Sequence, residues 1–175
     1  MKYRLISRFA VGLAVALPTM AMAQYYQNSS DFFGIGTGVR GRGAAYYGKR
    51  MNSLGVQIGV YNDIDLDPNS LSDGPPPNDT QFLGNYRTSP GFGTDLLFFP
   101  GNERQSLFFG VGLYYEDITE VGRSASSGFL YEFGHHNAWR TGLSVGLQAS
   151  VSNTSNFSMG YHNLLGWNIS FSMRQ

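Results

Sequence analysis

A run of alternating carboxylates is the part of this chain best suited to bind a metal ion. Asp63, Asp65 and Asp67 occupy alternate positions, and alternating oxygen ligands can converge on one Ca²⁺ ion. Pro68 stands where such a loop needs a glycine for its sharp turn, and Gly74 stands where it needs a bidentate glutamate. We therefore expect an acidic, solvated loop, in which Asp63, Asp65 and Asp67 are weak calcium candidates. No other metal site and no cofactor is expected.

The histidines offer a second kind of chemistry. His135 and His136 are adjacent in a segment that reads as a turn, where they could form a metal-binding or pH-sensing pair. The chain has no Cys and no H-x-x-x-H spacing, so we expect ordinary exposed histidines. Glu132 before this segment and Arg140 after it are predicted to form an ion pair.

A glycine-rich segment at 36–41, GTGVRG, matches G-x-G-x-x-G. A dinucleotide site needs a helix directly after such a turn, with its N-terminus at the phosphates. These glycines instead alternate with apolar residues along a predicted strand, so we exclude a nucleotide site.

The first 23 residues have the composition of a secretory signal peptide. A positively charged start, MKYRLISR, precedes an apolar stretch at 9–17 and an A-x-A sequence at 21–23. The apolar stretch is shorter than the ~20 residues that a membrane-spanning helix needs. We expect a mature domain over 24–175 with nine basic and twelve acidic residues, a formal charge of −3. No basic cluster remains in it, which argues against nucleic acid as a partner.

Apolar residues alternate with small or polar ones through most of the mature chain, as in β-strands with two different faces. The predicted strands are 33–40, 54–61, 91–99, 107–115, 128–134, 141–152, 156–162 and 167–174. The connection 62–89 contains three consecutive prolines and is predicted to lie outside any sheet. An additional strand at 44–50 stays open as an alternative that would shift the topology.

The composition of the polar face indicates which way the strands point. A face in contact with water would carry Lys, Glu, Asp and Thr, but this one is mostly Gly and Ser. Its isolated larger polar residues, which we predict to lie inside a barrel, are Gln57, Asp95, Glu132, Arg140, Gln148 and Arg174. Charged residues make up only 14% of the chain, against about 25% in soluble domains. The alternation therefore predicts a membrane barrel, apolar outside and polar inside, whose interior Tyr61, Phe108 and Tyr114 help to fill.

Aromatic residues also gather near strand ends. Trp139, Tyr161 and Trp167 are predicted at one rim of the barrel, and Tyr61 and Tyr115 at the other. Interfacial aromatic girdles are typical of proteins that span a bilayer.

The last strand, GWNISFSMRQ, gives the most specific family signal. With the alternation over Asp31–Gln175, it resembles the small outer-membrane β-barrel proteins of diderm bacteria, the OmpA-barrel or OmpX-like group often labelled porin family. The resemblance implies one eight-stranded antiparallel up-and-down barrel in the bacterial outer membrane. Its partners would be outer-membrane lipid, lipopolysaccharide and the barrel-assembly machinery. Gln175 departs from the family pattern, which ends in an aromatic residue.

The resemblance implies a structural, adhesion or surface-interaction role, since side chains can fill so small a barrel and prevent a general pore. A soluble, lipocalin-like barrel that binds a small apolar ligand is the alternative. A lipid A deacylase is a second alternative, but that pattern needs a Ser two positions after its His, and His162 is followed there by Leu164. We therefore expect no enzyme. With these eight strands and both termini in the periplasm, connection 62–89 would be periplasmic, where turns are usually short.

Overall fold

The computed structural model describes residues 29–101 and 105–174, so the predicted signal peptide lies outside the described residues. These residues form nine strands and one 3₁₀ turn, η1 (Pro68–Ser70). The strands are β1 (Ser29–Gly36), β2 (Ala44–Met51), β3 (Leu54–Tyr61), β4 (Thr80–Arg87), β5 (Gly91–Phe98), β6 (Gln105–Ser124), β7 (Leu130–Ser150), β8 (Ser155–His162) and β9 (Gly166–Arg174). Within the described ranges, no helix has the length and apolar character of a membrane span.

Eight of the strands close into an antiparallel barrel in the order β1-β2-β3-β5-β6-β7-β8-β9. The closure is made by β9, which pairs with β1 from Ser30↔Arg174 to Gly36↔Asn168. Closure satisfies the backbone hydrogen bonds of every barrel strand and leaves no open edge. The predicted eight-stranded antiparallel barrel is confirmed.

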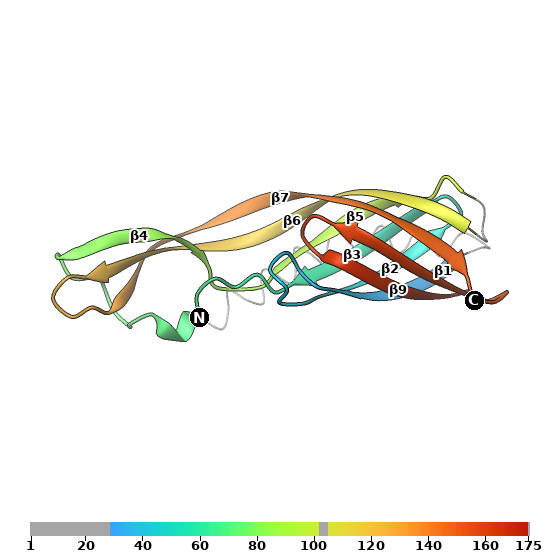
Figure 1. Ribbon diagram of the computed structural model, residues 1–175. Helices are drawn as coiled ribbons and strands as arrows, with labels where there is room; N and C mark the ends of the chain where they lie inside the picture. The colour runs from blue at the N-terminus through green and yellow to red at the C-terminus, as the bar shows by residue number, and fades with distance from the viewer. Residues whose placement is uncertain (1–28, 102–104, 175) are drawn as a thin grey trace.

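The strands β6 and β7 continue far beyond the barrel wall (Figure 1). Residues 116–123 of β6 pair with 130–138 of β7, and β4 pairs with β6 on its other side, from Thr80↔Ser124 to Arg87↔Ile118. We call this three-stranded extension the protruding sheet.

The connections differ in length at the two ends of the barrel. The connections β2–β3, β5–β6 and β7–β8 are at the end where β1 starts and β9 finishes, which we call the turn end. Segment 62–90, the long β6–β7 hairpin and the connections 37–43 and 163–165 lie at the opposite end, the loop end. The long connection 62–90 therefore lies on the opposite side of the barrel from the start of β1 and the finish of β9.

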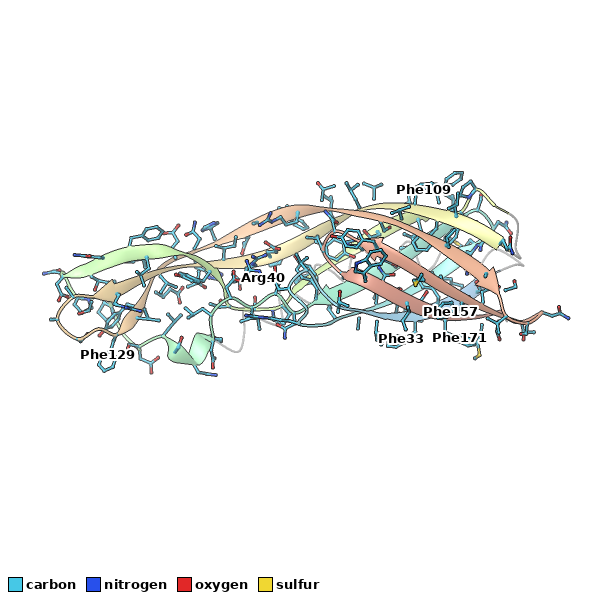
Figure 2. The ribbon with its side chains drawn as sticks, in the orientation of Figure 1. Phe33, Arg40, Phe109, Phe129, Phe157 and Phe171 are labelled. Carbon is cyan, nitrogen blue, oxygen red and sulfur yellow. The ribbon has the colours of Figure 1, made fainter. Side chains whose placement is uncertain are left out.

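Side chains on the barrel have the inverted polarity that the sequence predicted. On the outside, Phe33, Leu143 and Met173 are 58%, 56% and 61% exposed, whereas the inward Asp95 and Ser172 are 1% and 2% exposed. Figure 2 shows the labelled phenylalanines of the barrel strands on its outer wall.

The count of eight barrel strands is correct, but one barrel strand was left open and one predicted strand is not a separate strand. Segment 44–50, left open as an alternative, lies in the barrel strand β2, and 128–134 is the start of β7 with its preceding turn. The predicted turn at 135–137 does not exist, because β6 supplies an antiparallel partner for each of these residues. One missed strand and one additional strand therefore cancelled in the count.

The prediction that 62–89 lies outside any sheet is wrong for its second half. The prolines at 75–77 end before β4 begins at Thr80, so they do not interrupt its hydrogen bonds with β6. Because β2 belongs to the barrel, this connection lies at the loop end, opposite to both ends of the barrel chain, whereas the predicted strands placed it at the same end as the termini.

Inward glycines provide the space that interior rings occupy. A Cβ atom on Gly48 would lie 2.6 Å from Cε2 of Phe32 and 2.6 Å from the carbonyl oxygen of Val56. The Phe108 ring likewise occupies the space beside Gly146 and Gly160. The prediction that Tyr61, Phe108 and Tyr114 fill the interior is confirmed, since all three are buried.

Candidate functional site

A hydrogen-bonded network crosses the middle of the barrel around the carboxylate of Asp95. Gln57 Nε2 donates to Asp95 Oδ2 at 2.7 Å, the Tyr114 hydroxyl donates to the same oxygen at 2.6 Å, and His162 Nε2 lies 3.1 Å from Oδ1. Nδ1 of His162 accepts the backbone N–H groups of Leu164 and Leu165, each at 3.0 Å. Because backbone amides can only donate, the proton of the neutral imidazole must be on Nε2, directed at Asp95.

This arrangement gives His162 no role as a base toward a serine. Ser144 is its cross-strand neighbour on β7, but both ring nitrogens of His162 already have partners. Ser158 and Ser170 share a 2.5 Å hydrogen bond with each other. A base-activated hydroxyl is the minimum that a deacylase requires, and the geometry around His162 does not form one.

Arg50 lies at the turn end of the barrel interior. Arg50 donates from Nε to the carbonyl oxygen of Asn52 at 2.7 Å and from Nη1 to Oε1 of Gln148. Its guanidinium lies 4.3 Å from the centre of the Phe99 ring, which is within the range of a cation–π interaction. The interior is therefore occupied by side chains at this end as well.

Three carboxylates and three guanidinium groups meet where the barrel joins the protruding sheet. We call this group, Asp63, Asp65, Glu116, Arg40, Arg87 and Arg140, the mouth cluster. Figure 2 shows Arg40 at this junction. Its members come from the β1–β2 connection, the segment after β3, the end of β4, and β6 and β7. The cluster thus joins five parts of the chain at one place, and its formal charges balance.

Arg87 is the central cation of the mouth cluster. Its Nη1 pairs with Asp63 and lies 3.4 Å from Glu116, while its Nε lies 3.1 Å from Asp65. Arg40 Nε contacts Asp63 at 3.2 Å, and Arg40 also pairs with Asp65.

Glu116 is held from its other side by Arg140 and Tyr61. Arg140 Nε lies 3.1 Å from Glu116 Oε2, and the Tyr61 hydroxyl donates to Oε1 at 2.5 Å. The Glu116 side chain is 1% exposed, so its charge depends on these partners for compensation.

The calcium candidates do not converge on a common point. Asp63 and Asp65 are paired with arginines, and Asp67 caps η1 by accepting the backbone N–H of Asn69 at 2.9 Å. Across 29–101 and 105–174, no group of three or more His, Cys, Asp or Glu side chains could hold a metal ion. The calcium candidates are therefore corrected to two ion-pair partners and one helix cap.

The predicted interior polar residues divide between the barrel and the protruding sheet. Gln57, Asp95 and Gln148 point inward and are buried. Arg140 pairs with Glu116 at the mouth, whereas Glu132 lies on the protruding sheet, is half-exposed and has His135 as its neighbour at 3.9 Å. The predicted Glu132–Arg140 pair is therefore wrong. The side chain of Arg174 lies outside what the structure describes.

The predicted interfacial aromatics lie at one rim instead of two. Tyr115 is the cross-strand partner of Trp139, with ring centres 5.5 Å apart, and Tyr161 is the partner of Trp167 at 5.4 Å. All four belong to the loop end, whereas the Tyr61 ring is buried inside the barrel. Outward rings nearer the turn end include Phe33, Tyr47, Phe98, Phe157 and Phe171.

The architecture is a closed antiparallel barrel of eight strands, with apolar side chains outside and a packed polar interior. This is the polarity of barrels that span a membrane.

Comparisons with known proteins give only distant structural similarity. No family model matches the chain, and no curated protein matches it. Among solved structures it is similar to Ail, the attachment invasion locus protein of Yersinia pestis, in complex with the heparin analogue sucrose octasulfate (14% identity, 84% of this chain and 94% of that chain covered, TM-score 0.39). It is also similar to Neisserial surface protein A (13% identity, 84% and 90% covered, TM-score 0.38).

The sequence analysis did not identify Glu116 and Arg87 as site residues. Glu116 follows the inward alternation of Phe108, Gly112 and Tyr114 along β6, so an extension of that pattern would have found it. Arg87 reaches the site only because β4 folds back along β6, and no local sequence pattern indicates that.

Proposed function

We propose that this protein is an integral outer-membrane barrel that presents the protruding sheet for contact with ligands at the cell surface, and that it is not a general pore. The inverted polarity of the barrel carries this proposal. Outward leucine, valine and phenylalanine side chains cover the wall and are about half exposed, a surface that water disfavours at about 25 cal/mol per Å². Contact with the hydrocarbon of a bilayer removes this unfavourable free energy of exposing apolar side chains to water.

The interior supports the same proposal and argues against a lipocalin-like carrier. A carrier of apolar ligands needs an apolar cavity, but the centre of this barrel holds the Asp95 network and its mouth holds the charges around Glu116. These groups already have partners, and the cavity that Phe108, Ser144 and His162 help to line measures only about 20 Å³. That is room for a water molecule but too small for an apolar ligand or an open aqueous channel.

The partners that follow from this role are outer-membrane lipid, lipopolysaccharide and the barrel-assembly machinery. The last strand supports the third, because Trp167, Ile169, Phe171 and Met173 all point outward from β9. Short turns on the periplasmic side and long connections outside are the usual arrangement, so the loop end and the protruding sheet would face the surroundings of the cell.

Fractionation combined with surface proteolysis tests this proposal. In cells that express the full chain, we expect the protein in the outer-membrane fraction, with gel mobility that changes on heating. A protease added to intact cells should cut within 66–79, ahead of β4. Recovery in the soluble periplasmic fraction, or protection of 66–79 until the outer membrane is opened, would contradict the proposal.

A further inference from the structure

The protruding sheet has an aromatic face that no other described part of the chain covers. Phe82 on β4 and Tyr131 on β7 are the cross-strand partners of Gly122 on β6, so all three share one face of the sheet. The ring of Phe133 occupies the space that a side chain on Gly122 would need. We call Phe82, Tyr131 and Phe133 the aromatic face; Phe82 is 60% exposed and Phe133 is 43% exposed.

Carboxylates stand at both ends of the aromatic face. Glu120 is two residues from Gly122 on the barrel side of β6; its side chain is 42% exposed, and its Oε1 lies 3.4 Å from Nδ1 of His136. On the tip side, Ser124 donates its hydroxyl to Asp79, which also accepts the backbone N–H of Ser126 at 2.8 Å. A cation over these rings would therefore have a negative charge on either side.

The surface around the aromatic face is also negatively charged. Residues 66–86 and 117–138, which exclude the mouth cluster, contain Arg123 and six carboxylates, so one minus six gives a formal charge of −5. This charge would repel a phosphate-bearing lipid surface and attract cationic partners. Exposed aromatic rings attract Lys and Arg groups further through their π faces.

We infer that the aromatic face is a docking surface for a cationic polypeptide segment with apolar side chains between its lysines or arginines. Apolar groups of the segment pack on Phe82 and Phe133, and its cations lie between these rings and the carboxylates of Glu120 and Asp79. This inference rests on the proposed surface role and specifies the chemical class of its partner.

A peptide titration on the full mature chain tests this inference. The protein is placed in phosphatidylcholine nanodiscs and titrated with a short amidated peptide of repeating Lys-Lys-Leu units, with empty discs as the blank. We expect saturable binding. Phe82→Ser should weaken it about five-fold, as expected for the loss of roughly one cation–π contact. Glu120→Gln should weaken it and reduce its dependence on salt.

Two matched variants control for general loss of apolar or acidic groups. Val39→Ser removes an exposed apolar side chain from the β1–β2 connection, and Asp31→Asn removes a carboxylate at the turn end; both should bind like the unaltered chain. Heat-dependent gel mobility of each sample reports barrel insertion separately, so a failure of docking is distinguishable from a failure of the proposed membrane role.

Three results would overturn the inference. One is equal binding of a Glu-Glu-Leu repeat peptide, and another is unchanged binding by both Phe82→Ser and Glu120→Gln. The third is preferential association of the protruding sheet with vesicles of anionic lipid, which would make a membrane surface its partner.

Discussion

Glu116 shows how a single carboxylate can join a barrel to a sheet beyond it. Three side chains from different elements, Tyr61, Arg87 and Arg140, converge on its two oxygens. An unpaired buried charge is costly, and these three partners compensate the charge of the Glu116 carboxylate. We infer that Glu116 holds the root of the protruding sheet in place.

Replacement of Glu116 by Gln should measure this role. The variant keeps the shape of the side chain but leaves Arg87 and Arg140 with one negative charge fewer. Removing one partner of a buried ion pair costs about 3–5 kcal/mol, and we expect the lower end because Arg140 is half exposed. Urea unfolding of the protein in lipid vesicles gives the value. Glu132→Gln, on the half-exposed Glu132, should change stability by less than about 0.5 kcal/mol.

Gly48 tests whether the barrel interior is as closely packed as the contacts indicate. A side chain there overlaps the ring of Phe32 and the backbone of β3, so Gly48→Val should destabilise the barrel by about 1–3 kcal/mol through overpacking. Ala45→Val, on the outward face of the same strand, is the matched control in the same unfolding experiment. Equal stability of the two variants would show that the interior has unfilled space.

Among the elements, β4 is held at its start by Asp79, which binds the tip of the β6–β7 hairpin. Asp79, just before β4, accepts hydrogen bonds from Ser124 and from the hydroxyl and backbone N–H of Ser126. The hydrogen bonds from Ser126 hold the pKa of Asp79 below its ordinary value of 3.8. The carboxylate therefore stabilises the folded tip at any pH above that value, and this contribution is lost as the pH falls through the lower pKa of the folded state.

Hydrogen exchange of the hairpin tip measures this dependence. We expect the protection of the amide of Ser126 to fall as the pH is lowered below the ordinary pKa of Asp79. Asp79→Asn should show low protection at every pH. If the unaltered chain gave a flat profile through the acidic range, Asp79 would not anchor the tip.

The alternation of apolar with small or polar residues was enough to predict the barrel and its polarity. It was not enough to predict the protruding sheet. Gly, Ser and Gln57 on one face, and Val and Leu on the other, fix the inside and outside of each barrel strand by local spacing alone. The bulge at Phe133 shifts the alternation within β7, so 128–134 resembled a strand of its own. The pairing of β4 depends on contacts distant in sequence, and the position of Arg87 follows from that pairing.

As a whole molecule, the protein is a closed barrel whose interior holds side chains along its length, with a small cavity of about 20 Å³ that Phe108, Ser144 and His162 help to line. Arg50 and Phe99 occupy the turn end, the Asp95 network the middle, and the mouth cluster the loop end. Each group holds the next side chains in place, so no continuous water-filled path is expected along the axis.

This filling predicts that the reconstituted protein does not conduct as a general pore. In planar bilayers, the full mature chain should show no steady, porin-like current at neutral pH. Large, persistent openings of the unaltered chain would mean that the interior network does not fill the barrel in a membrane.

The central claim is that the outer wall faces hydrocarbon, and the two tryptophans of the chain test it directly. Trp139 and Trp167 are both on the outer face at the loop-end rim, 63% and 64% exposed. Their fluorescence should be quenched in vesicles of brominated lipid. Bromines near the headgroups should quench it more strongly than bromines at the bilayer centre. The variants Trp139→Phe and Trp167→Phe separate the signals of the two tryptophans. Emission that no brominated lipid quenches would contradict the membrane barrel.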